Sequence, residues 1–232
     1  MKKILLSAVM AATVMMAQDG FDLTPTPVSQ TQIDSDATEG MTRLTGLYAT
    51  IDDAELSGAG VQVAKKTGKE GGATNLSGAL MMLSGSGGGM DSTVVSGNVA
   101  YLWENYQSPQ EAAGLTIFYG ADFSYVYMNM YSDALEIDVY TMMYGGTAGL
   151  QYNHHTPSLI ISPFAVGKYL MGSYEADIWG NSYSSESDSI DPIFNTAFGF
   201  DVFFKSTGTT LSAMLKSDSG STTTMVSYAW FW

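Results

Sequence analysis

Residues 222–232, TTTMVSYAWFW, decide the fold of this chain. Every second side chain counted back from the end is large and apolar, in the order Trp232, Trp230, Tyr228 and Val226. The residues between them are mostly small or polar, as Ser227 and Thr223 are. Because successive side chains of a strand point to opposite faces of a sheet, this period of two predicts a β-strand with one apolar face.

The final strand resembles the C-terminal strand of bacterial outer-membrane β-barrels. In that family a terminal aromatic residue and alternating apolar residues are read by the barrel-assembly machinery. The usual last residue of the family is Phe, and here it is Trp232. The assembly signal that the resemblance implies consists of Val226, Tyr228, Trp230 and Trp232. The resemblance also implies three partners, namely the assembly machinery, outer-membrane lipid and lipopolysaccharide.

The opposite end of the sequence predicts export. Lys2 and Lys3 precede an apolar run from Ile4 to Met16, and Ala17 offers a small residue for cleavage. This order predicts a signal peptide over residues 1–17, which is too short to span a membrane as a helix. Residues 18–40 are rich in Thr, Pro, Gln and Asp and show no periodicity. They predict a disordered, acidic periplasmic leader, with a plug or an additional strand as the alternative.

The composition narrows the class of protein. The chain has no cysteine, so its stability must come from a core or from closure of a sheet rather than from disulfides. Its formal net charge of −14 argues against binding to nucleic acid, because that function needs a basic surface. Charged residues make up 14% of the chain, below the roughly 25% of soluble domains. This shortage fits a protein whose outer face meets lipid.

Residues 41–232 contain about ten strand-like segments separated by turn residues. In the clearest segment, residues 115–131, the apolar side chains of Ile117, Tyr119 and Phe123 alternate with small or polar ones. The fold class that we predict is all-β, a closed antiparallel transmembrane barrel with ten strands. Eight or twelve strands stay open as alternatives, because the pattern is weak in the first half of the barrel.

An even number of strands places both ends of the barrel in the periplasm and thereby assigns the connections. We expect outer loops at residues 132–137 and 175–191, the second being the longest connection. The expected periplasmic turns are residues 67–73, 105–113, 153–157 and 206–208.

Polar residues on the less apolar faces are expected to point into the barrel. The lumen-facing candidates are Asp122, Lys168, Asp201 and Gln151, together with Asp138, Asn98, Asn195 and Lys216. Inside a narrow barrel such groups either pair with one another around a filled interior or line a thin water path. An acidic excess would favour cations if a path exists.

Other candidate sites give weaker signals. His154 and His155 are the only histidines and fall in a predicted periplasmic turn, where a solvated pair is expected rather than a metal or catalytic site. Proteases of the omptin type need a histidine high in the outer loops, and no predicted outer loop of this chain contains one. The sequence therefore predicts no enzyme, no catalytic residue, no metal and no cofactor. The methionines, including Met81, Met82 and Met128, are expected to pack adaptably against lipid.

The sequence leaves two functions open for a protein that we expect to be a monomer in the outer membrane. The first is a structural or surface-interaction barrel that meets its partners through the outer loops, chiefly residues 175–191. The second is a narrow, porin-like passive channel for small solutes or cations, biased by Asp122 and Asp201.

Overall fold

The computed structural model describes residues 38–51, 54–69, 71–87, 89–106, 113–133, 135–180, 183–218 and 221–232. The predicted signal peptide and residues 18–37 of the predicted leader lie outside this part of the chain. Within it, no helix is long and apolar enough to cross a membrane.

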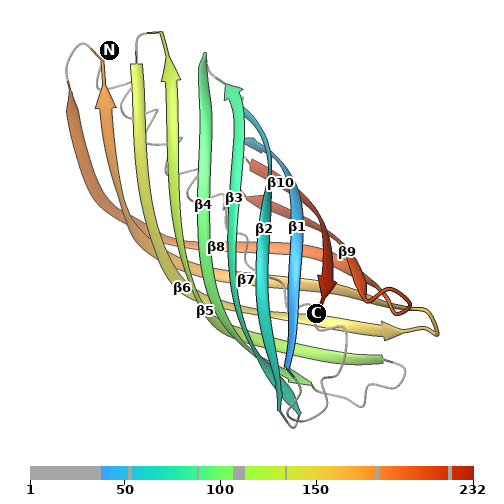
Figure 1. Ribbon diagram of the computed structural model, residues 1–232. Helices are drawn as coiled ribbons and strands as arrows, with labels where there is room; N and C mark the ends of the chain where they lie inside the picture. Colours follow the sequence, from blue (N-terminus) through green and yellow to red (C-terminus); the bar gives the residue numbers. More distant parts are fainter. Residues whose placement is uncertain are drawn as a thin grey trace.

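Ten antiparallel strands form one closed barrel (Figure 1), which confirms the predicted fold class and strand number. The strands are β1 (Thr38–Ile51), β2 (Ala54–Lys69), β3 (Gly72–Gly87), β4 (Met90–Tyr106), β5 (Ala113–Ser132), β6 (Leu135–His155), β7 (Leu159–Trp179), β8 (Ser184–Phe204), β9 (Thr209–Asp218) and β10 (Ser221–Phe231). Each strand pairs with its neighbours in sequence, and β1 closes the barrel against β10 from Met41↔Phe231 to Ile51↔Ser221. The barrel begins three residues earlier than expected, since Thr38 to Gly40 already belong to β1.

The two rims of the barrel differ. We call the rim that holds the start of β1 and the end of β10 the terminal end, and the opposite rim the distal end. β6, β7 and β8 are 21 residues long, whereas β9 and β10 have 10 and 11. In Figure 1 the distal parts of β7 and β8 therefore extend well away from the red strands β9 and β10.

The predicted long loop at residues 175–191 is wrong. β7 continues to Trp179 and β8 begins at Ser184, so that only residues 180–183 connect them. On the distal part of β7 the outward face becomes polar while Tyr174, Ala176 and Ile178 are buried, and residues 184–189 of β8 are polar on both faces, but the pairing continues to Ile178↔Ser184. The prediction depended on an apolar outward face, and it therefore missed this extension.

Inward and outward side chains alternate along every strand. Pro163 points outward in β7 and interrupts the ladder with β6, which lacks pairs between Gln151↔Phe164 and His154↔Ile161 but keeps the same register on both sides. The interruption follows from the missing N–H of proline.

Two inward-facing glycines lie under aromatic rings. Phe118 is in register with Gly149, and Phe164 is in register with Gly199. A Cβ atom at Gly149 would collide with the Phe118 ring and with the carbonyl oxygen of Ala165. These positions therefore need glycine, because the ring of the neighbouring strand occupies the space of a side chain.

Candidate functional site: the barrel interior

The structure places all four lumen-facing candidates inside the barrel and joins them into two pairs. The Lys168 ammonium lies 2.9 Å from a carboxylate oxygen of Asp122, and both side chains are buried. Lys168 is on β7 and Asp122 is on β5, so this ion pair crosses over β6. The inward position of β6 beside Asp122 is Gly145, which leaves room for the lysine chain.

The second pair also spans an intervening strand. Gln151 on β6 donates a hydrogen bond of 3.2 Å to Asp201 on β8, across β7. Both residues are fully buried. The buried guanidinium of Arg43, on β1, is the nearby positive charge that acts on Asp201. Asp201 therefore connects three parts of the wall that are not adjacent in the sheet.

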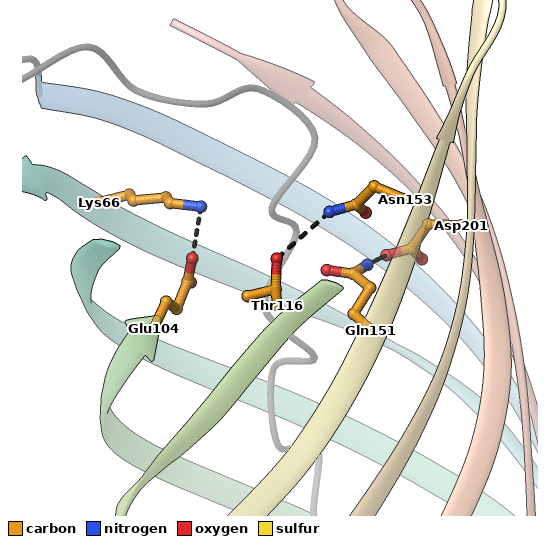
Figure 2. Close-up of polar contacts among 6 residues, drawn as sticks. All are labelled: Lys66, Glu104, Thr116, Gln151, Asn153 and Asp201. Carbon is orange, nitrogen blue, oxygen red and sulfur yellow. Dashed lines mark hydrogen bonds and ion pairs between the residues drawn. The ribbon is translucent and has the colours of Figure 1, made fainter. Parts of the chain in front are cut away.

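Sequence reasoning missed two further interior contacts, which Figure 2 shows beside Gln151 and Asp201. Lys66 on β2 forms an ion pair of 2.6 Å with Glu104 on β4, and Asn153 donates a hydrogen bond of 3.3 Å to Thr116. The inward position of Lys66 could have been predicted, because Lys66 alternates with the outward residues Val61 and Val63 of the same strand. Its partner Glu104 could not have been predicted, since that residue lies two strands away.

Of the remaining inward candidates, Asn98, Asn195 and Lys216 are buried in the interior, but Asp138 is not. Asp138 faces outward near the distal end, where it accepts hydrogen bonds from Tyr127 (2.6 Å) and Asn129 (3.0 Å). The inward prediction was wrong because Asp138 shares the outward phase of Tyr140 and Met142 on the same strand.

The distal half of the interior holds a large apolar cluster, which was not predicted from the sequence, beside a few buried hydroxyl residues such as Ser92, Ser96 and Thr141. The members of the cluster include Leu47, Leu56, Met81, Leu83, Val126, Met128, Met130, Ile137, Val139, Met143, Leu170 and Ile193. The expectation that methionines pack against lipid is thus wrong for Met81, Met128, Met130 and Met143, and it holds for the exposed Met82 and Met142. Charged groups and their partners are gathered in the terminal half of the interior, beneath this cluster.

The outer face carries a band of exposed apolar side chains. On β7 the outward residues are apolar from Ile161 to Tyr169 and then become Ser173, Glu175 and Asp177. Aromatic residues mark the edge of the band toward the terminal end, where Trp103 stacks on Tyr119 at 5.8 Å between ring centroids. An apolar band with aromatic girdles is how a barrel meets the two interfaces of a bilayer.

The final strand lies in this band as its alternation predicts. Val226, Tyr228, Trp230 and Trp232 all point outward and are exposed. Trp232 also helps to close the seam, the line along which β10 pairs with β1. Its backbone N–H and carbonyl group bond to Gly40, and its indole N–H donates to Thr42 at 3.1 Å.

Comparison with solved structures identifies the class of protein. The translocator domain of the autotransporter NalP from Neisseria meningitidis is similar with a TM-score of 0.52 and 8% identity, over 98% of this chain and 95% of that one. The outer membrane protease OmpT from Escherichia coli gives 0.55 and 7%, over 87% of this chain and 96% of that one. The transport unit of the autotransporter AIDA-I from Escherichia coli gives 0.53 and 10%, over 94% and 96%. The chain has the fold of a bacterial outer-membrane β-barrel protein. No family model matches the sequence, and neither does any curated protein.

At this level of identity the structural likeness shows the fold of the outer-membrane barrel and not its activity. The three similar structures are two transport units and a protease, so the chemistry has to be argued from this barrel itself. Among the described residues, no group of three or more His, Asp or Glu side chains is arranged to hold a metal ion. His154 and His155 are the last residues of β6 rather than part of a turn, and they lie at the terminal end.

Proposed function

We propose that the outer-membrane barrel acts at the cell surface through its distal rim, chiefly the β7–β8 hairpin, and that its interior is closed to solutes. The observation that carries the proposal is the continuation of β7 and β8 beyond the apolar band with an outward face that is polar. The terminal end holds the start of β1 and the end of β10, and the periplasmic position that we expect for both ends of an even-stranded barrel therefore applies to that rim. The projecting hairpin then faces the outside of the cell.

The side chains inside the barrel support the proposal that the interior is closed to solutes. In its terminal half, the pairs Lys168–Asp122 and Lys66–Glu104 bridge over intervening strands. In its distal half, the cluster of buried apolar side chains opposes a continuous water path, with hydroxyl groups such as Ser92, Ser96 and Thr141 buried beside it. The ion pairs stabilise the barrel without forming a path.

The surface role is tested by labelling single cysteines on intact cells, which the absence of native cysteine makes simple. Ser187→Cys places a thiol on the exposed distal part of β8, and Thr207→Cys places one in the exposed β8–β9 turn. We expect a membrane-impermeant maleimide to label the first variant directly and the second only after the outer membrane is permeabilised. The reverse order of labelling would contradict the proposal.

A narrow passive channel is the second candidate function. It is favoured by the buried hydroxyl groups of Ser124 and Thr147, which have no hydrogen-bond partner among the described residues and could contact water. Liposomes containing the purified barrel would then swell in small sugars faster than empty liposomes do. We expect no difference between the two.

We propose no catalytic role and no cofactor for this barrel. Both histidines lie at the terminal end of β6, remote from the distal rim where a surface enzyme would meet its substrate. We also propose that the barrel is a monomer, that lipopolysaccharide contacts its distal surface, and that the barrel-assembly machinery reads β10.

A further inference from the structure

We infer that the distal edge of β8 binds an extended basic segment of another protein, which adds to the barrel wall as a further strand. This inference rests on the proposed surface function, since it names the class of partner for the same rim.

The first support is an edge of the sheet that has no neighbour. β8 pairs with β7 up to Ser184, but it pairs with β9 only from Ala197 to Phe204. Among the described strands, residues 184–196 therefore have a partner on one side only. At about 3.3 Å per residue this edge is roughly 40 Å long. Apart from the Ser189 N–H, which donates to the Asp188 carboxylate at 2.7 Å, the N–H and C=O groups on its unpaired side form a template on which an extended peptide gains main-chain hydrogen bonds.

The edge is only partly protected against such pairing. Proteins usually protect an exposed edge with proline, bulges or lysine. Here Pro192 lies beside a bulge, where the register with β7 shifts between Leu170 and Gly172. Beyond the bulge, residues 184–190 contain neither proline nor lysine. Ser185, Ser187 and Ser189 are exposed and short, so they leave space for an incoming backbone.

The negative charge of the β7–β8 hairpin favours a basic partner. The charged residues from 169 to 191 are Glu175, Asp177, Glu186, Asp188 and Asp191, and no basic residue occurs in this range. Glu186 and Asp188 share one face, because they pair with the buried Ala176 and Tyr174 of β7.

A partner strand with lysine or arginine at every second position would place a cation beside each of these two carboxylates. A second copy of the chain would bring the same acidic edge and would be repelled, which favours a basic partner over self-association.

The experiment uses the full-length barrel in nanodiscs of zwitterionic lipid. The probe is a ten-residue peptide of alternating lysine and threonine. It is compared with the same peptide N-methylated at alternate backbone amides and with a glutamate–threonine peptide. Binding is followed by fluorescence anisotropy, and protection of residues 184–190 by amide hydrogen exchange.

The matched variants change three exposed charges each. Glu186→Gln/Asp188→Asn/Asp191→Asn removes the charges of the edge, and Glu55→Gln/Asp91→Asn/Asp133→Asn removes three from other parts of the distal rim. We expect the lysine peptide to bind and to slow exchange in residues 184–190. The first variant should weaken binding roughly tenfold, because it removes the two paired carboxylates and a third charge close to them, and the second should leave it unchanged.

Equal binding of the N-methylated peptide would show attraction by charge alone and would overturn the inference. Equal loss in both variants, tight binding of the glutamate peptide, or protection produced by a second copy of the barrel would overturn it as well. If Ser187→Cys is labelled on intact cells but the lysine peptide does not bind, this inference fails while the surface function stands. If Ser187→Cys cannot be reached from outside, the surface function itself fails.

Discussion

Replacing Lys168 by methionine should destabilise the barrel strongly, because it leaves a carboxylate buried without its cation. The Lys168 ammonium and the Asp122 carboxylate are 2.9 Å apart, with side-chain exposures of 7% and 0%. Neither group can turn toward solvent when its partner is removed. The double variant Lys168→Met/Asp122→Leu removes both charges together and keeps apolar volume in their place.

The magnitude follows from burial and distance. Two unit charges about 4 Å apart interact by about 4 kcal/mol at an effective dielectric constant of about 20. Breaking a buried pair by removing one partner costs about 3–5 kcal/mol, whereas replacing both with apolar groups is often neutral. We therefore expect Lys168→Met to lower the free energy of unfolding by about 3–5 kcal/mol, and the double variant to recover most of that loss.

The assay is urea unfolding of the barrel in lipid vesicles, followed by tryptophan fluorescence and by the shift of the folded band on gels without boiling. Lys205→Met is the matched control, because Lys205 is exposed and its ammonium group donates to the carbonyl oxygen of Thr156 rather than to a carboxylate. The control should change the free energy of unfolding by less than about 1 kcal/mol. A loss of less than about 1 kcal/mol for Lys168→Met would mean that water reaches Asp122, and would refute the closed interior.

Further predictions concern the glycines and the seam. Gly149→Ala should destabilise the barrel by about 1–3 kcal/mol in the same urea assay, because the new methyl group collides with the neighbouring ring and backbone. Gly146→Ala is its control, since a Cβ there would have no atom nearer than 3.8 Å and the change should stay within about 0.5 kcal/mol. Gly40→Leu should displace the Trp232 ring, and a lower temperature for loss of the folded gel band would show it. Deletion of residues 230–232 removes the terminal pairs of β10 with β1 and should abolish the heat-modifiable band, whereas an unchanged band would show that the seam does not need them.

The period of two was sufficient to predict the wall of the barrel and the inward position of Asp122, Lys168, Asp201 and Gln151. A strand pattern assigns each side chain to a face, and a closed barrel turns one face inward. The same pattern could not predict which side chains meet. Lys66 reaches Glu104 across a strand, and such contacts depend on the tilt and stagger of the whole barrel.

The buried apolar cluster and the long β7–β8 hairpin were not predicted, because in these segments the sequence no longer alternates between an apolar outward face and a polar inward face. In β5 the inward Val126, Met128 and Met130 alternate with outward tyrosines, so that both faces read as apolar and the buried cluster is hidden. At the distal end of β7 the outward face turns polar while Tyr174, Ala176 and Ile178 face inward, and residues 184–189 of β8 are polar on both faces, so the segment looked like a loop. Backbone hydrogen bonds between β7 and β8 stabilise this part of the hairpin, and the sequence of a single strand does not show them.

Conductance of the purified barrel in planar lipid bilayers tests the central claim of a closed interior most directly. The ion pairs of the terminal half and the apolar cluster of the distal half predict a trace without steps above that of the bare bilayer. Discrete, reproducible steps from the wild-type barrel would contradict this account and would establish a passive channel in its place.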